Sequence, residues 1–576
     1  MRKRQQREPA SIKQSEEQSS EKKPTLKFVP LGGFEEIGRN MMFFEYENEI
    51  LVIDAGLQFP EENTPGIDYI IPNISYLEEH KDKIVGFIIT HGHYDHIGAI
   101  PHVLGKMGNP TIITNQISKE IINKRQQDYP GTVEPRFDIV KGGSTRKIGK
   151  HFSVEFFDVI HNIPDGVGII IETPIGKIVH PGEFKFDYDK EGKAVGMDTW
   201  KKLGKQNIHT LLLDSTGAEV PGVSIAEHVV EGEIEKLIKS TRGRVIVATF
   251  ASLLDRLAAI MKIAEKYNRH VAVSGYSMKT NLQIARDLKY IKLRNDTLIP
   301  IQEINKYPDN KVLLLCTGAQ GEPNASLMRI ANKMHKQVTL KPTDMIILSS
   351  SIVPGNEHSV QVIKDNLARQ TPNIYHNKML DIHSSGHAPM EELKAVIGMV
   401  KPRFFMPMHG YYFMRMRNAK HAQEVLGLSH SETIVGDNGQ VVEMTKDSIR
   451  LTDKEIPSSY VMVDGLGVGD VEEVVLRDRR NLSEEGMVVI ITTIGRHHKK
   501  MIKNPDIISR GFIYLKKNQE LLENMRKKIR SIVARFPRDR EIESEYLKTL
   551  IRDQIGQFIY TKTKRRPMIL PVVIEI

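Results

Sequence analysis

The chain lacks the features that mark secreted and membrane-spanning proteins. Its 576 residues include one cysteine, Cys316, so no intramolecular disulfide can form. Cys316 follows the apolar run Val312–Leu315, which indicates a core position. No apolar run is long enough to span a bilayer, and no hydrophobic segment of a secretory signal follows the basic start Met1–Arg4. We therefore expect a cytoplasmic protein with no membrane partner.

The chain also lacks a strong excess of either charge. Its 81 Lys and Arg residues against 72 Asp and Glu residues leave a net charge of +9. Such a modest basic excess suits a polyanion partner without proving one. Residues 1–24 hold almost no large apolar side chains and are expected to be a disordered tail. That tail is either a solvated segment or a weak RNA-tethering arm.

The motif His91-Gly-His-Tyr-Asp-His96 organises the rest of the chain. It follows the apolar, β-branched run Ile84–Ile89, which is typical of a buried strand. The two alternating histidines can point at one centre, and the turn can direct Asp95 and His96 at a second. Imidazole nitrogen and carboxylate oxygen are ligands of borderline metals such as zinc. The motif therefore predicts a metal site at the end of a strand.

Other candidate residues come from distant parts of the chain. Asp54 ends an apolar strand, where an isolated carboxylate is costly unless it is hydrogen-bonded. His161 precedes a loop, a place where a histidine alone is more often structural. Glu183 and His409 each follow apolar segments and complete a set of metal-ligand types.

The motif and the Ile-Gly-Ala that follows it resemble the second motif of the metallo-β-lactamase fold. From about Leu26 to Ile576 the chain resembles the ribonuclease J family, in the β-CASP branch of these hydrolases. The resemblance implies an α/β fold: an αββα sandwich, an inserted β-CASP α/β domain and a small α/β C-terminal domain. The implied boundaries are a tail at 1–24, the metallo-β-lactamase domain at 25–215 and 373–447, the β-CASP domain at 216–372, a linker at 448–460 and the C-terminal domain at 461–576.

The resemblance also implies the residues of a two-metal centre. Asp54 would orient a histidine ligand, and Asp95 and His387 would be catalytic. Two divalent ions about 3.5–4 Å apart would clamp a phosphodiester. Zinc is favoured over manganese, which stays possible. The implied ligands are His91, His93, Asp95, His96, His161, Glu183 and His409.

The middle of the chain indicates phosphate contacts. Four apolar strands each lead into a turn rich in Gly, Ser or Thr, and such turns offer N–H groups and hydroxyls to phosphate oxygens. The succession resembles the β-CASP domain, which covers the active site and guides RNA. The implied RNA- and phosphate-binding residues are Asp214, Ser252, Tyr276, Ser277, Ser385, Gly386, His387 and Ala388.

The chain departs from the family pattern at several of these positions. Glu183 stands where the family has aspartate, and Tyr276 stands where it usually has arginine. Losing a guanidinium removes a bidentate phosphate donor, while a tyrosine could stack on a base. Leu253 and Gly217 replace asparagines, and Tyr411 replaces a glutamate.

The resulting hypothesis is a metal-dependent ribonuclease with 5′→3′ exonuclease and endonuclease activity in RNA maturation and decay. RNA would be its partner, together with further copies of the chain, a dimer or tetramer through the C-terminal domain, and possible RNA-decay proteins. Two alternatives stay open. One is a catalytically weak structural subunit of an RNA-degrading complex, which the departures motivate. The other is a small-molecule metallo-hydrolase, which would not explain the long insertion.

Overall fold

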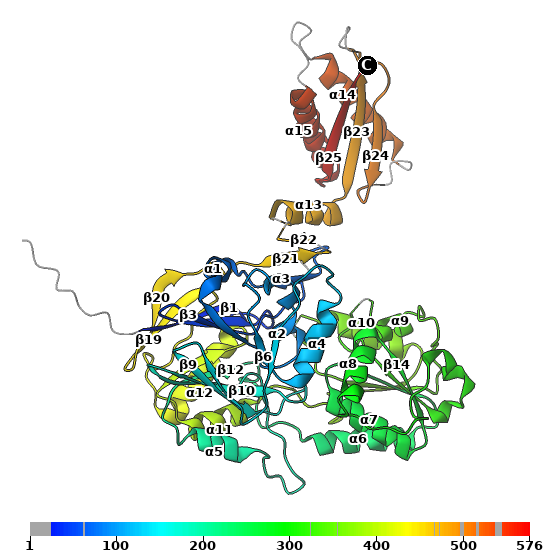
Figure 1. The fold of residues 1–576 in the computed structure, drawn as a ribbon. Helices are drawn as coiled ribbons and strands as arrows, with labels where there is room; N and C mark the ends of the chain where they lie inside the picture. Colours follow the sequence, from blue (N-terminus) through cyan, green and yellow to red (C-terminus); the bar gives the residue numbers. More distant parts are fainter. Residues whose placement is uncertain are drawn as a thin grey trace, which may run out of the picture. The chain divides into compact units, whose positions relative to one another are not determined.

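The computed structural model describes residues 25–60, 64–322, 324–353, 355–465, 467–469, 471, 473–495, 500–513, 518–535 and 544–576. These residues form two compact units (Figure 1). The first runs to Gly56 and continues over Pro72–Ser458, and the second joins Leu57–Ile71 to Ser459–Ile576. The tail expected to be disordered lies outside the described residues. Among the described helices, none is long and apolar enough to cross a membrane.

Two β-sheets with a shared apolar core make up most of the first unit. Phe28 and Phe44 of one sheet are buried in the same cluster as Phe156 and Leu212 of the other. This is the predicted metallo-β-lactamase sandwich. The first sheet has the order β20-β19-β1-β2-β3-β5-β6-β7, and the second has the order β18-β12-β11-β10-β9-β8. The strands of the first sheet are β1 (Leu26–Gly32), β2 (Met41–Tyr46), β3 (Glu49–Ile53), β5 (Ile84–Ile88), β6 (Ile112–Thr114), β7 (Phe137–Ile139), β19 (Gln440–Met444) and β20 (Ile449–Glu455); those of the second are β8 (Thr145–Ile148), β9 (Phe152–Asp158), β10 (Val167–Thr173), β11 (Gly176–His180), β12 (Ile208–Asp214) and β18 (Phe404–Met408).

Helices cover the sandwich on its outside. Trp200 of α5, Val396 of α11 and Ala422 of α12 are buried in one cluster with Leu211 and Phe405 of the second sheet. The amphipathic stripes of these helices therefore form a second core behind that sheet. The helices of this part are α1 (Ser75–Glu79), α2 (Tyr94–Ile97), α3 (Ile100–Val103), α4 (Gln116–Gln126), α5 (Met197–Leu203), α11 (Met390–Val400) and α12 (Tyr412–Leu426), with a 3₁₀ turn at Lys81–Lys83.

The predicted α/β insertion lies between β12 and β18. Its five strands are all parallel, in the order β14-β15-β13-β16-β17. Parallel strands end at one edge of a sheet, so the turns rich in Gly, Ser and Thr lie at the same edge. The strands are β13 (Val245–Thr249), β14 (His270–Ser274), β15 (Val312–Cys316), β16 (Met345–Ser349) and β17 (Asn373–His376); the helices are α6 (Glu227–Ser240), α7 (Leu254–Lys266), α8 (Tyr276–Asp287), α9 (Ser326–Ala331) and α10 (Glu357–Ala368), with 3₁₀ turns at Ile301–Lys306 and Asp309–Lys311.

The insertion leaves the sandwich and returns to the neighbouring strand. β12 pairs in parallel with β18, and Asp214 lies opposite Met408 in the register. The residues that follow the two strands therefore lie side by side, although the whole insertion separates them in sequence. This pairing brings Asp214 next to His409.

The second unit is built around a three-stranded sheet of the order β24-β23-β25. Val488 and Ile490 of β23 are buried against Met525 and Ile529 of α14 and Ile555 of α15. A smaller sheet of the order β22-β21-β4 belongs to the same unit. The elements are β4 (Tyr69–Ile71), β21 (Val461–Asp464), β22 (Gly467–Val468), α13 (Glu473–Glu484), β23 (Met487–Ile494), β24 (Asp506–Arg510), α14 (Gln519–Ala534), α15 (Ser544–Thr563) and β25 (Met568–Glu575).

Three segments differ from the expected organisation. The segment expected to be a linker contains β20, which pairs with β19 after the turn from Thr445 to Ser448. β17 extends the inserted sheet past the expected boundary at 372. β4, from the N-terminal part of the chain, pairs with β21. Each difference is a strand pairing between segments, which local composition does not specify.

Candidate metal centre

The loop after β5 presents four candidate ligands. The backbone at His93 is extended, with φ −71° and ψ 147°, and the chain then enters the single turn of α2. His91 and His93 therefore precede the helix, whereas Asp95 and His96 lie within it. This change of direction places the first pair in one group of metal-ligand side chains and the second pair in another.

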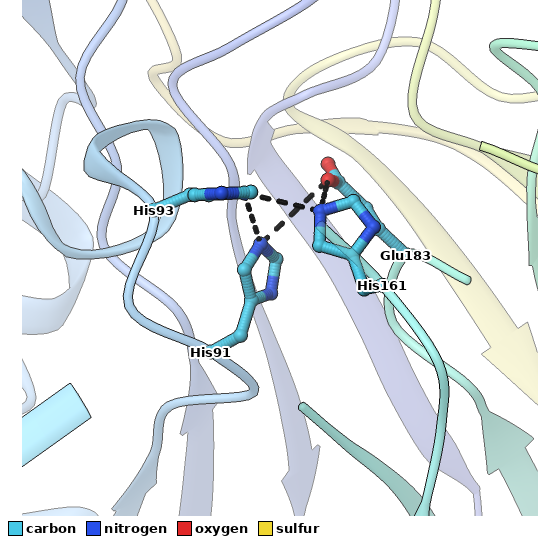
Figure 2. A group of neighbouring side chains, drawn as sticks. All are labelled: His91, His93, His161 and Glu183. Carbon is cyan, nitrogen blue, oxygen red and sulfur yellow. Dashed lines mark hydrogen bonds and ion pairs between the residues drawn. The ribbon is translucent and has the colours of Figure 1, made fainter. Parts of the chain in front are cut away.

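The first group consists of His91, His93, His161 and Glu183, whose side chains converge in Figure 2. His93 Nδ1 lies 3.1 Å from both His91 Nε2 and His161 Nε2. Glu183 Oε2 lies 3.1 Å from His161 Nε2 and 3.6 Å from His91 Nε2. Burial, followed by the charge on neighbouring imidazoles, holds the pKa of His91 and His93 well below the ordinary value. The group therefore offers neutral imidazoles, the form that binds metal.

The second group consists of Asp95, His96, Glu183 and His409. Glu183 Oε1 lies 2.9 Å from His96 Nε2 and 3.1 Å from His409 Nε2. Asp95 Oδ2 lies 3.6 Å from His96 Nε2 and 3.9 Å from His409 Nε2. Glu183 thus directs one carboxylate oxygen to each group.

The hydrogen bonds and charges around the imidazoles fit a bound cation in each group. His161 Nδ1 donates to the carbonyl oxygen of Gly386 at 2.8 Å, which leaves its Nε2 lone pair facing the first group. Burial opposes a charged His96, yet the carboxylates of Glu183, Asp54 and Asp95 raise its pKa well above the ordinary value. These carboxylates therefore favour a positive charge at His96 Nε2, which a bound cation would supply in place of the proton. His409 Nε2 is buried and makes no hydrogen bond to any residue that the structure describes. Converging lone pairs and carboxylates of this kind fit divalent ions that accept imidazole nitrogen, zinc among them.

Asp54 lies behind His96, a candidate ligand, and is hydrogen-bonded to it. Its side chain is fully buried, and its Oδ2 accepts a hydrogen bond from His96 Nδ1 at 2.8 Å. The backbone N–H of Thr90 donates to Asp54 Oδ1 at 2.9 Å. The carboxylate therefore holds Nδ1 of His96 and turns Nε2 toward the second group.

The carboxylate of Asp214 contacts the imidazoles of His387 and His409. We expected it among the RNA-binding residues, but it is only 2 % exposed. His387 Nδ1 donates to its Oδ2 at 2.7 Å, and His409 Nδ1 lies 3.3 Å from its Oδ1. Thr216 adds its N–H and its hydroxyl, each at 2.8 Å from Oδ1. Asp214 therefore acts on the site through these histidines, and RNA cannot reach its carboxylate in this arrangement.

His387 lies beside the first group with its proton held in place. Its Nε2 is 3.9 Å from Glu183 Oε2. Burial opposes the charged imidazole, but the carboxylates of Asp214 and Glu183 raise the pKa of His387 to about 9. The ring can therefore donate a proton from Nε2 while Asp214 holds Nδ1.

The loop that carries His387 contains three more expected RNA-binding residues. Ser385 is exposed, and its hydroxyl accepts the backbone N–H of His387 at 3.2 Å. A Cβ on Gly386 would lie 2.6 Å from His161 Cε1, so the loop approaches the ligand closely only as glycine. Ala388 is 1 % exposed and packs in the core, so its side chain is not available to RNA.

The inserted domain supplies the remaining expected residues at the ends of its parallel strands. Ser252 precedes α7, and Tyr276 and Ser277 begin α8. Tyr276 is 66 % exposed, whereas the two serines are half-buried. These residues are therefore accessible, unlike Asp214 and Ala388.

Family models match four segments of the chain. They are the metallo-β-lactamase superfamily over residues 35–203, the ribonuclease J β-CASP domain over 242–367, the Zn-dependent metallo-hydrolase RNA specificity domain over 377–431, and the ribonuclease J C-terminal domain over 474–576. Ribonuclease J2 of Bacillus subtilis is 36 % identical over 552 residues, which is 96 % of this chain and 99 % of that protein. The chain belongs to the ribonuclease J family.

Other relatives agree with this assignment. Ribonuclease J 1 of Streptococcus pyogenes is 37 % identical over 544 residues, covering 94 % of this chain and 96 % of that protein. Ribonuclease J 2 of Staphylococcus aureus is 36 % identical over 559 residues, covering 96 % of this chain and 99 % of that protein. A solved protein of unknown function from Enterococcus faecalis shares the fold, with a TM-score of 0.51 at 16 % identity, and the match covers 73 % of this chain and all of that one.

The departures from the ribonuclease J pattern have distinct surroundings. A Cβ on Gly217 would lie 2.2 Å from the carbonyl oxygen of Ala388, so an asparagine here would require the backbone to shift. Leu253 is buried at the start of α7. Tyr411 precedes α12, and its ring stacks on Phe413 with centroids 6.0 Å apart. Nothing in the structure explains the glutamate at position 183.

Several residues at the site were not predicted for this ribonuclease J family member. Asn40 Nδ2 lies 3.0 Å from His96 Nε2, and Thr216 supports Asp214. Lys185 lies two residues after Glu183, a candidate ligand, and is buried. A charged residue within the run Phe184–Phe186 is the one local signal that could have identified it. The others are ordinary polar residues that acquire importance through long-range packing.

Proposed function

We propose that this member of the ribonuclease J family is a metal-dependent ribonuclease that hydrolyses RNA phosphodiesters with two divalent ions. One ion would be held by His91, His93 and His161, and the other by Asp95, His96 and His409, with one Glu183 oxygen on each. The position of the two Glu183 oxygens is the observation that supports two ions over one. Zinc is the preferred ion because imidazoles make up three of the four ligand side chains of the first group and two of the four of the second, and manganese is the alternative.

The chain's own groups supply the rest of the reaction. The two ions, when bound, polarise the phosphate and lower the pKa of a water. His387 holds a proton at Nε2 and donates it to a phosphate oxygen or to the leaving 3′-oxygen, while Asp214 keeps the ring in orientation. Asp95 would be one of the residues that hold the second ion. The products would be a 5′-phosphate and a 3′-hydroxyl.

RNA would approach along the turns of the inserted domain. Ser385 and the N–H groups of its loop contact the phosphate beside His387. Ser252 and Ser277 contact the backbone further along the strand, and exposed Tyr276 stacks on a base. These contacts would not depend on the nucleotide sequence of the RNA. They suit both 5′→3′ exonuclease and endonuclease cutting in RNA maturation and decay in the cytoplasm, where RNA-decay proteins would be further partners.

A single experiment separates the enzyme from a catalytically weak structural subunit. Purified protein is stripped with EDTA and given Zn²⁺ or Mn²⁺, and a 5′-monophosphorylated, 3′-labelled RNA is followed in time. We expect degradation that returns with metal and is lost in the His93→Ala variant, whereas exposed His430→Ala serves as a control. No cleavage with either metal by folded wild-type protein would favour the structural-subunit function.

The second unit supports self-association. Its sheet carries α14 and α15 on one face, and the alternate residues of β25 face away from that core: Leu570, Val572 and Ile574 are 42 %, 40 % and 43 % exposed. Ile508 of β24 is exposed as well, at 44 %. We propose that this apolar face joins copies of the chain into a dimer or tetramer. Light scattering should show an oligomer that dissociates when Val572 and Ile574 are changed to lysine.

A further inference from the structure

A network of ionic groups, in which two buried cations meet one half-buried carboxylate, lies next to the metal centre. Glu227, the first residue of α6, binds two cations from other elements. Lys185 Nζ lies 2.5 Å from Glu227 Oε1, and Arg256 Nη2 and Nε lie 2.6 and 3.0 Å from Oε2. The side chains of Lys185 and Arg256 are 2 % and 1 % exposed. One carboxylate therefore compensates two buried cations.

Both cations also hold the loop that leads to His387. Lys185 Nζ donates to Ser384 Oγ at 2.9 Å. Arg256 Nη1 donates to Ser349 Oγ at 3.0 Å, and that hydroxyl donates to the carbonyl oxygen of Ile382 at 2.7 Å. Through these bonds Glu227 is connected to two points of the segment that ends at His387.

The same loop and Lys185 are directly linked to metal ligands. Gly386 O accepts the hydrogen bond that fixes the His161 ring. The Lys185 N–H donates to the carbonyl oxygen of Ile160 at 2.8 Å, next to His161. Lys185 is also two residues from Glu183. A shift of the network would therefore displace two members of the first group, His161 and Glu183.

Stability alone does not account for these charges. Apolar side chains of similar volume often stabilise a core as well as a buried ion pair does, whereas removal of one partner leaves an uncompensated charge. Charged groups provide directional bonds of fixed length instead. Here the bonds beyond the two ion pairs lead to the loop Ile382–His387, directly from Lys185 to Ser384 and through the Ser349 hydroxyl from Arg256 to Ile382.

We propose that Glu227 is a positioning residue of the metal centre. From the inserted domain, it holds Lys185 and Arg256 so that the loop Ile382–His387 keeps His161 and His387 directed at the ions. The part that concerns His387 and RNA rests on the proposed function, whereas the part that concerns metal binding does not.

The test compares Glu227→Gln with Glu235→Gln on the same helix. Glu235 is also ion-paired, with Lys266 at 2.6 Å, but at the surface. Zn²⁺ bound after dialysis, its affinity, and kcat and KM on RNA are measured for each protein. Glu227→Gln should lower metal affinity or kcat about tenfold or more, as loss of a group behind a metal ligand does, with little change in KM. Glu227→Asp, which keeps the charge, should recover part of the loss.

Ser384→Ala keeps the test decisive if Glu227→Gln fails to fold. It removes one loop contact without leaving an unpaired charge, and it should shift metal affinity or kcat in the same direction by less. Wild-type metal affinity and kcat in folded Glu227→Gln, or in Ser384→Ala where that variant must stand in, would overturn the proposal. If wild-type protein bound metal without cutting RNA, the proposed function would fail while the metal comparison still tested Glu227.

Discussion

His387 Nδ1 lies 2.7 Å from Asp214 Oδ2, across 173 residues of sequence. Asp214 also lies 3.3 Å from His409 Nδ1, so one buried carboxylate orients an expected proton donor and an expected metal ligand. The contact depends on the pairing of β12 with β18, which brings the two strand ends together.

The substitution Asp214→Asn should lower kcat by about 10–100-fold, the usual cost of losing a carboxylate behind a metal ligand. The amide can donate where the carboxylate accepted, so it favours the wrong tautomer of His387 and His409. Steady-state kinetics with metal analysis would measure this. Asp447→Asn, at an exposed ion pair with Arg403, should match wild type. Unchanged kcat in Asp214→Asn would exclude an orienting role.

The substitution Glu183→Asp should keep or raise activity, because the carboxylate still offers an oxygen to each group and the family pattern has aspartate here. Glu183→Gln should lose activity by about 100-fold, since a neutral amide binds divalent ions poorly. Metal content by elemental analysis should fall in Glu183→Gln. Full activity of Glu183→Ala would show that another group bridges the ions.

The substitution Gly386→Ala should damage the first metal group. Its Cβ would lie 2.6 Å from both His161 Cε1 and Asn162 Nδ2, so the loop or the ligand must shift. We expect kcat to fall about tenfold or more. Gly232→Ala in α6 is the control: its Cβ meets nothing within 4 Å. This control should leave activity unchanged and raise the free energy of unfolding by about 0.5–1 kcal/mol. Equal kcat in the two variants would argue against the close approach.

The substitution Tyr276→Arg should increase the preference for a 5′-monophosphate over a 5′-triphosphate end. Tyr276 is exposed at the start of α8, and a guanidinium there offers bidentate donors. The kcat/KM for the 5′-monophosphate RNA divided by that for the 5′-triphosphate RNA should rise about tenfold. This factor corresponds to the low end of the free energy of one hydrogen bond to a charged group. Tyr276→Phe should keep the wild-type ratio, because the ring remains. If Tyr276→Arg and Tyr276→Phe gave the same ratio, end selection would depend on other residues.

Local sequence was sufficient for much of the architecture. The apolar strands were predictable because strands buried on both faces, such as β13 and β15, need continuous apolar runs, and the helices because burial of one face imposes a period of 3.6 residues. The position of β20 was not, since a strand needs a partner and the register lies outside its own sequence. β4 is the same case, because its partner β21 lies far away in the chain.

For the site, the sequence by itself determined the four donors of His91–His96, since a strand and one helical turn place them within six residues. Only the tertiary structure decided that Glu183 directs an oxygen to each group, that Asp214 is buried behind His387, and that Ala388 packs in the core. These are contacts between segments that are far apart in the chain. Their geometry follows from how the sheets pair and pack, which no local pattern encodes.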